Sequence, residues 1–381
     1  MQKIAYRRFP VKTLLALLLT GMAMPGFADM SVIRKPVDIG AYEMVYSTSK
    51  NAVLVATTLS RNENGGIVYE LDAKNLSVIK AIDTAKKPFG AAINSRTNTA
   101  WFGGSIEGCV IAVDIISGKV KGITTLVPQS THNEKTAPPV RERSTTQQEH
   151  TGSAGKDVKK HDGKRPPAPR EVAVDEGTNT VYISGVNRDD SLLWVVDGNT
   201  MQLKQTIRGL GIMNTGLAVD SDNHRLYTSN AEGEFITIDT ALNKVISRTR
   251  IVSDTQEHLL MNISLDKNGH RAFISDNKVA GIYVVDLKNS KVINHISVPE
   301  SLAVLFNPKR NEIYATHRNE GTVSIINGTT YSVVDTVKLP EHPNSLVLAA
   351  DGSALYVTVK QDVSHDKPAT APDDIVRISL D

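Results

Sequence analysis

The chain has 381 residues, of which 40% are hydrophobic and 22% are charged, so it can bury a substantial core. Its one cysteine, Cys109, excludes an intramolecular disulfide, a Cys-x-x-Cys-His haem site and any multi-cysteine metal site. The 43 basic and 41 acidic residues nearly balance, so no overall positive charge favours a nucleic-acid partner. A nucleic-acid site would have to be a local patch.

Residues 1–28 have the pattern of a secretory signal peptide. A basic segment precedes a short apolar run at 14–24, and the small residue Ala28 marks the expected cleavage site. The apolar run is too short to span a bilayer as a helix, and no later run is long enough. Removing the leader's four basic residues leaves 39 basic against 41 acidic residues, a formal charge of −2. We therefore expect a soluble protein that is exported to the periplasm, by the Sec route rather than the twin-arginine route.

The remaining chain, 29–381, repeats a unit of four short strands. Each strand is rich in β-branched and aromatic residues, and each gap carries Asn, Gly or Pro, as the stretch 299–340 illustrates. An acid or amide closes the third strand of every unit: Asp72, Asp114, Asp197, Asp239, Asp286, Asn327 and Asp381. Most of these residues are separated by about 41 to 47 positions, close to the length of a four-stranded propeller blade.

Seven copies of the second strand can be identified, and a first strand precedes each of them. The second strands are expected at 52–56, 99–103, 180–184, 225–229, 271–275, 313–316 and 354–358. The first strands are expected near 43–46, 89–93, 171–174, 216–219, 262–265, 302–306 and 345–348. The pattern predicts an all-β fold, a single seven-bladed β-propeller of four-stranded blades. Trp101 in a second strand and Cys109 in the apolar run 109–113 are expected in the core between blades.

The seventh unit lacks a fourth strand, because the chain ends at the third-strand residue Asp381. The segment 31–40 resembles the fourth strands, for example 332–340. We infer that the N-terminal strand pairs with the C-terminal blade and closes the ring, which protects the strand edges that an open array would expose.

One interval between units is twice as long as the others and contains an insertion at 128–168. This segment has five prolines, no apolar strand, eight Lys or Arg residues and five Asp or Glu residues. The spacing of His132, His150 and His161 matches no compact metal motif. We expect a polar, mobile loop rather than a metal-binding or polyanion-binding arm.

The repeats resemble the YVTN-type propeller repeat, with Leu355-Tyr356-Val357-Thr358 and Tyr227-Thr228-Ser229-Asn230 at the motif position. From 30 to 380 the chain resembles YncE-like members of this family. The stretches that carry the resemblance are 40–44, 87–91, 179–185, 194–198, 300–308, 316–318 and 342–345. The resemblance implies a seven-bladed periplasmic propeller with an affinity for DNA, single-stranded DNA in particular, and with no established catalytic activity. The insertion is longer than that family needs.

The candidate site is the mouth of the central channel, because first strands line the channel of a propeller and ligands usually bind there. The candidate ligand-binding residues are Tyr42, Lys87, Phe89, Arg170, Asn214, Asn262, His317, Arg318, Asn344 and Lys360. Cations can neutralise phosphates and aromatic rings can stack on bases. Alternatively, these polar groups only bond one another and water. Glu43, Glu171 and Glu300 would repel a phosphate.

No catalytic residue, cofactor or metal site is predicted. The sequence has no Gly-x-Ser-x-Gly elbow and no Walker or dinucleotide glycine pattern. The pairs Asp189-Asp190 and Asp373-Asp374 are expected in loops, as turn formers. We expect a monomeric, non-enzymatic binding protein, with single-stranded DNA or periplasmic proteins as partners. A metal-dependent hydrolase of the lactonase kind, built from Glu and Asn at the channel mouth, is the remaining alternative.

Overall fold

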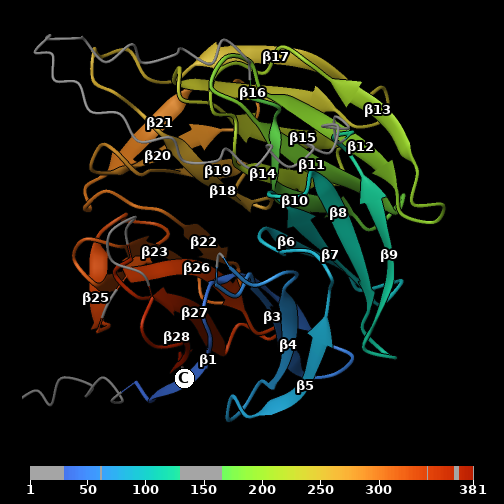
Figure 1. Cartoon of the computed structure of the whole chain (residues 1–381). Helices are drawn as coiled ribbons and strands as arrows, with labels where there is room; N and C mark the ends of the chain where they lie inside the picture. The colour runs from blue at the N-terminus through green and yellow to red at the C-terminus, as the bar shows by residue number, and fades with distance from the viewer. Residues whose placement is uncertain (1–29, 61, 129–164, 341, 364–368, 381) are drawn as a thin grey trace, which may run out of the picture.

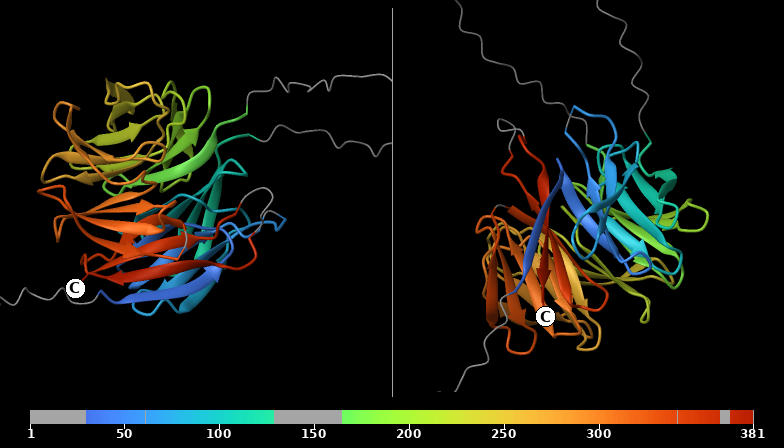
Figure 2. Two further views of the ribbon diagram at one scale, coloured as in Figure 1. Left: turned by 90° about the vertical axis from the view of Figure 1, so that its left-hand side faces the viewer. Right: turned by 90° about the horizontal axis from the view of Figure 1, so that it is seen from below.

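Short strands and tight turns close into a ring of seven sheets around a central axis (Figures 1 and 2). The computed structural model describes residues 30–60, 62–128, 165–340, 342–363 and 369–380. The predicted signal peptide, residues 129–164 of the insertion predicted at 128–168, and Asp381 lie outside these residues. Within them, no helix is long and apolar enough to cross a membrane. The predicted seven-bladed β-propeller of four-stranded blades is confirmed.

The blades follow one another in chain order. Blades 1 to 3 are β2 (Ala41–Ser47), β3 (Ala52–Thr57), β4 (Ile67–Asp72), β5 (Val78–Asp83); β6 (Ala91–Asn94), β7 (Thr99–Gly104), β8 (Cys109–Asp114), β9 (Lys119–Thr125); and β10 (Ala168–Asp175), β11 (Thr180–Val186), β12 (Leu192–Asp197), β13 (Leu203–Ile207). Blades 4 and 5 are β14 (Leu217–Asp220), β15 (Arg225–Ser229), β16 (Glu234–Asp239), β17 (Lys244–Arg250); and β18 (Leu260–Asp266), β19 (Arg271–Asp276), β20 (Ile282–Asp286), β21 (Val292–Ile296). Blades 6 and 7 are β22 (Val304–Asn307), β23 (Glu312–His317), β24 (Thr322–Asn327), β25 (Val333–Lys338); and β26 (His342–Leu348), β27 (Ala354–Lys360), β28 (Asp373–Ser379), β1 (Val32–Asp38).

Apolar side chains from neighbouring blades form the core. The second and third strands are buried almost throughout, whereas outer strands such as β17 alternate between exposed and half-buried residues. Trp101 and Trp194, from blades 2 and 3, share one cluster between the two sheets. Trp101 is fully buried and Cys109 is 2% exposed, so both predictions of a core position are confirmed.

The recurring third-strand acid caps the turn that follows it. The Asp197 carboxylate accepts backbone N–H groups of Asn199 at 2.9 Å and Thr200 at 3.0 Å. Asp72, Asp239, Asp286 and Asn327 make the equivalent pair of bonds. The turn then passes through a residue with positive φ, such as Gly118 at 59°. This local hydrogen bonding explains why an acid or amide recurs in the sequence.

Blade 7 combines both ends of the chain. Strand β1 pairs antiparallel with β28, from Val32 opposite Ile378 to Asp38 opposite Asp373. This pairing is compatible with the predicted closure of the ring. An ion pair between Arg34 and Asp374 joins the same two strands.

The prediction that Asp373-Asp374 lies in a loop is wrong. Both residues begin β28 and are buried, at 4% and 8% exposure. They are tolerated there because Lys360 and Arg34, distant in sequence, pair with them. Sequence spacing gave no signal of either partner.

Candidate functional site at the channel mouth

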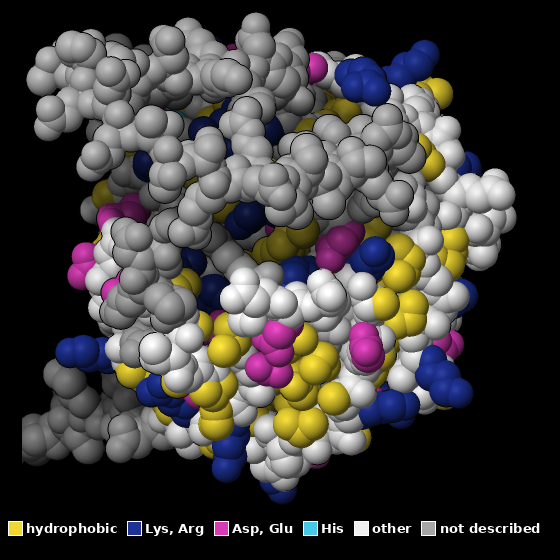
Figure 3. Space-filling view, viewed as in Figure 1, with side chains coloured by type: hydrophobic (Ala, Val, Ile, Leu, Met, Phe, Trp, Pro, Cys, Tyr) yellow, Lys and Arg dark blue, Asp and Glu magenta, His cyan; other side chains and the backbone are white. Residues whose placement is uncertain are grey.

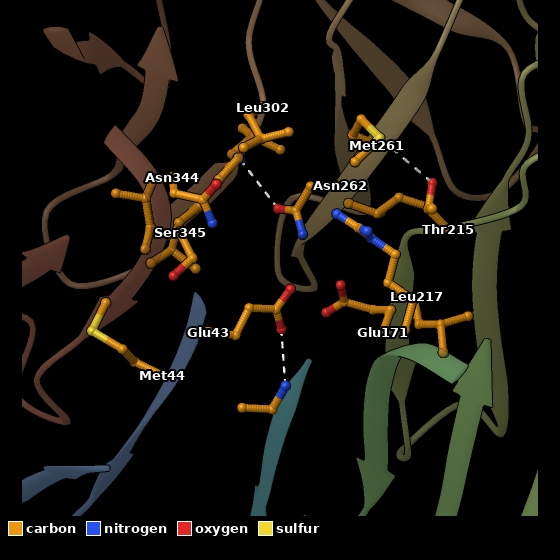
Figure 4. A pocket seen from close by; sticks show the side chains of 17 residues that line it. Glu43, Met44, Glu171, Thr215, Leu217, Met261, Asn262, Leu302, Asn344 and Ser345 are labelled. Atoms are coloured by element: carbon orange, nitrogen blue, oxygen red, sulfur yellow. Dashed lines mark hydrogen bonds between the residues drawn. The ribbon is translucent and has the colours of Figure 1, made fainter. Parts of the chain in front are cut away.

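The inner strands of all seven blades surround a central channel with a cavity of about 190 Å³ (Figure 4). In blades 1, 3, 5 and 7 the inner strand has a register shift, between Ala41 and Met44 in the case of β2. Such a bulge exposes two consecutive residues on one side of a strand. One position of the bulge holds Tyr42, Arg170, Met261 and Asn344, and the next holds Glu43, Glu171, Asn262 and Ser345.

Two aromatic rings and a lysine form one corner of the mouth. The ring centroids of Tyr42 and Phe89 are 4.6 Å apart with planes tilted by 47°. The Lys360 ammonium lies 4.0 Å from the Tyr42 ring centroid, a cation–π contact. Lys360 is 6% exposed and its Nζ also bonds the Asp373 carboxylate at 3.0 Å and the Ala41 carbonyl at 2.9 Å. Its charge is therefore compensated, and it packs against the Tyr42 ring.

Two arginines lie at the mouth without a buried ion-pair partner of this kind, although the carboxyl groups of Glu43 and Glu171 are close enough to interact with the charge of Arg170. Arg318 follows β23 and its Nη1 donates to the Asn344 Oδ1 at 2.8 Å. Burial lowers the pKa of the Arg318 guanidinium, and the positive charge of Arg170 also lowers it. Tyr42 and Asp373 raise the same pKa, but by less. Arg170 is exposed at the start of β10 and lines the cavity. Within the described residues, neither arginine forms an ion pair with a carboxylate.

Two carboxyl groups meet in the channel next to the arginines. Glu43 and Glu171 point toward each other from β2 and β10 and are within hydrogen-bonding reach (Figure 4). Burial raises the pKa of both, and the negative charge of Glu43 helps to hold the pKa of Glu171 well above its usual value. The Ala91 N–H donates to Glu43 at 2.9 Å. Burial and the neighbouring charge of Glu43 therefore favour the protonated form of Glu171.

Two amides complete the wall. The Asn262 Oδ1 accepts the Val304 N–H at 3.1 Å, and the Asn344 Oδ1 accepts Arg318. Their Nδ2 groups are left facing the channel (Figure 4). Seen from this face, Lys and Arg side chains lie near the centre of the ring, with Asp or Glu side chains among them (Figure 3). The site thus offers guanidinium and amide donors, a tilted pair of aromatic rings and the carboxyl pair. In the described residues, no group of three or more His, Cys, Asp or Glu side chains could hold a metal ion.

No protein-family model matches the chain. The chain does match curated relatives. It is 46% identical over 368 residues to proteins named "Uncharacterized protein YncE" from Salmonella typhimurium strain LT2 and from Escherichia coli strain K12, and the match covers 96% of each chain. The chain belongs to the YncE family. A solved structure titled "Structure of U3-55K" aligns with a TM-score of 0.66 over 92% of this chain and 98% of that one. At 12% identity this likeness concerns the fold alone.

Not all predicted site residues of this YncE-family protein reach the channel. Tyr42, Phe89, Arg318 and Lys360 meet at its mouth, and Arg170, Asn262 and Asn344 line the cavity. Lys87 does not join them, because its Nζ donates to the carbonyl groups of Thr58 at 2.6 Å and Ser60 at 2.9 Å. This lysine is 6% exposed and links the loop after β5 to the loop after β3.

His317 and Asn214 are likewise interior residues. His317 is 1% exposed and lies between the hydroxyls of Ser324, at 2.8 Å, and Ser301, at 3.2 Å. Burial lowers the pKa of its ring, which favours the neutral form. Asn214 is fully buried and accepts the Thr228 hydroxyl at 2.7 Å. Both residues bond buried partners, so the structure does not bring them together with the residues that line the cavity.

The pairing of Glu43 with Glu171 was not foreseen. The sequence led us to expect these acids either to repel a phosphate or to belong to a metal-dependent site at the mouth. One signal could have found the pair: both residues directly precede an apolar inner-strand run, at matching positions of units one and three. Matching positions in a propeller lie at the same depth of the channel.

Proposed function

We propose that this chain is an exported, non-enzymatic binding protein whose channel mouth takes single-stranded DNA. The observation that carries the proposal is the convergence of Arg170 and Arg318 at the mouth, without ion-pair partners among the described residues, beside the Tyr42–Phe89 ring pair. Two guanidinium groups with unused donors favour an anionic ligand. The resemblance of the sequence to DNA-binding propellers supplies the choice of nucleic acid.

The chemistry of the mouth fits a strand better than a duplex. Guanidinium groups can bond successive backbone phosphates, while unstacked bases can lie on the Tyr42 and Phe89 rings. Base stacking of this kind is worth about 1–3 kcal/mol per base and tolerates any sequence. A closed duplex presents no free base faces to these rings. We therefore expect single strands to bind more tightly than duplexes, with little sequence preference.

Export to the periplasm is part of the proposal and rests on the leader at 1–28. The mature protein should begin at Asp29. Intact-mass and N-terminal sequencing of protein from the periplasmic fraction would test this. A full-length protein that remains in the cytoplasmic fraction would contradict it.

Fluorescence anisotropy with a labelled oligothymidylate tests whether the channel mouth binds single-stranded DNA. Wild-type protein should bind the single strand, and R170A and R318A should each weaken binding about tenfold, because a hydrogen bond to a charged group contributes about 1.5–3 kcal/mol. R250A is the matched control, since Arg250 ends the outer strand β17 and is exposed. Equal binding by wild type and the double variant R170A/R318A would contradict the proposed site. Absence of binding at low salt would contradict a nucleic-acid ligand and leave a protein-interaction scaffold as the better explanation.

A further inference from the structure

We infer that Glu43 and Glu171 form a proton-sharing pair that couples anion binding at the channel mouth to the uptake of a proton. This inference rests on the proposed function and concerns how pH regulates binding at the same site. Protonation of the pair would remove the negative charge that offsets Arg170, so an anionic ligand would bind more tightly as the pH falls.

The two glutamates meet because blade 2 leaves room between them. They come from blades 1 and 3, and the inner strand β6 of blade 2 presents only the small side chain of Ala91 to the cavity. A Cβ atom on Gly90 would overlap the carbonyl oxygen of Arg170, so glycine permits β10 to approach β6 closely. Glu171 can therefore reach across to Glu43, whose carboxylate is fixed by the Ala91 N–H.

A pair of carboxyl groups within hydrogen-bonding reach cannot be fully ionised, since like charges at that distance repel strongly. One proton is held between Glu43 and Glu171, and one negative charge remains beside Arg170. Of the described residues, no lysine or arginine makes an ion pair with either carboxyl. A second proton can neutralise this remaining charge.

The other charged groups around the pair are few. Strand β10 contributes Arg170, β2 contributes Tyr42, and the rim contributes Arg318 and the Lys360–Asp373 ion pair. The described lining residues from β6, β14, β18, β22 and β26 are all non-titratable. His342, the first residue of β26, bonds the Arg318 carbonyl at 2.9 Å and is a further titratable group close to the mouth.

Protonation of the pair should increase the affinity of the mouth for an anionic ligand. With Glu43 ionised, the mouth carries the charges of two arginines and one carboxylate, and an incoming phosphate is repelled by the carboxylate. After protonation only the arginines remain charged. We expect the affinity for a single strand to rise about three- to tenfold from about pH 8 to about pH 5.5, below the limit of about tenfold per pH unit for one proton.

The test measures binding of a labelled oligothymidylate, whose bases do not titrate in this range, at constant ionic strength across these pH values. E43Q/E171Q should bind tightly at every pH, because neither glutamine carries a charge. E43Q alone keeps Glu171, which can still ionise beside Arg170, so it should retain part of the pH dependence. H342N should retain the pH dependence of the wild type, which separates the pair from the nearby histidine. Melting temperatures of all variants would verify that each is folded.

The outcomes separate the two proposals. Binding that strengthens with falling pH in the wild type, and not in E43Q/E171Q, supports the proton coupling. Binding with the same pH dependence in wild type and E43Q/E171Q overturns the coupling and leaves the binding site intact. No binding at any pH overturns the proposed ligand and the coupling with it. Infrared spectra give an independent check, since a protonated-carboxyl band at neutral pH should be present in wild type and absent in E171Q.

Discussion

Replacing Asp373 with alanine removes the residue that joins the two ends of the chain at the channel. Its carboxylate accepts the N–H groups of Gly40 at 3.0 Å and Ala41 at 2.9 Å, at the turn between β1 and β2. The same carboxylate bonds the Lys360 ammonium at 3.0 Å and the Gln361 N–H at 2.9 Å. The variant D373A therefore leaves three backbone donors without an acceptor, and it leaves the buried Lys360 ammonium with the Ala41 carbonyl but without a carboxylate partner.

The size of the effect follows from burial. Asp373 is 4% exposed and Lys360 is 6% exposed, so solvent screens their ion pair little. Breaking a buried ion pair by removing one partner costs about 3–5 kcal/mol. For a domain of about 300 residues, this corresponds to a fall in Tm of about 5–8 °C. D373N keeps one acceptor oxygen and should lose about half as much stability.

Thermal unfolding followed by circular dichroism or calorimetry measures this loss. D335A is the control, because Asp335 is exposed on the outer strand β25 and its removal should change stability by less than about 0.5 kcal/mol. The double variant K360M/D373A should recover part of the loss, since it no longer buries an unpaired ammonium. A Tm for D373A within about 1 °C of wild type would refute the role assigned to this residue.

Three further outcomes follow. Deleting residues 29–39 removes β1 and should lower the Tm sharply, whereas an unchanged melting curve would rule out closure by this strand. Burial lowers the pKa of His258, but its bonds to Asp254 and Asp276 outweigh this and raise it. The stabilisation by His258 should therefore be complete below about pH 6.5 and be lost as the pH rises through the raised value. A variant H258N whose stability falls with pH as steeply as wild type would contradict this. Burial raises the pKa of the Cys109 thiol to about 12, so it should react with a thiol reagent only after unfolding, and rapid labelling of the native protein would be inconsistent with the packing.

The fold could be predicted because its determinants are local and repeat along the chain. A carboxylate or amide at the end of each third strand caps a turn through its own neighbours, as Asp197 does, so the same residue type recurs at the blade period. Strand patterning within each unit depends on residues only two positions apart. The missing fourth strand of the last unit then indicated where the N-terminal segment belongs.

The site could be predicted only in part, because it depends on contacts between distant blades. Lys87 and Arg318 are both cations near the inner strands, yet backbone carbonyls bind Lys87 while Arg318 reaches the mouth. Sequence spacing does not distinguish the two. Glu43 and Glu171 can meet because β10 lies close to β6. In the sequence, the only sign of this close approach is the glycine at position 90, where a Cβ atom would overlap the Arg170 carbonyl.

The salt dependence of oligonucleotide binding tests the central claim most directly, because it counts phosphate contacts. For single strands the slope of log K against log salt is about −0.7 per phosphate neutralised. If Arg170 and Arg318 each contact a phosphate, R170A/R318A should have a slope smaller in magnitude by about 1.4 than that of wild type, and R250A should match wild type. Equal slopes for wild type and R170A/R318A would contradict the assignment of the binding site to the channel mouth.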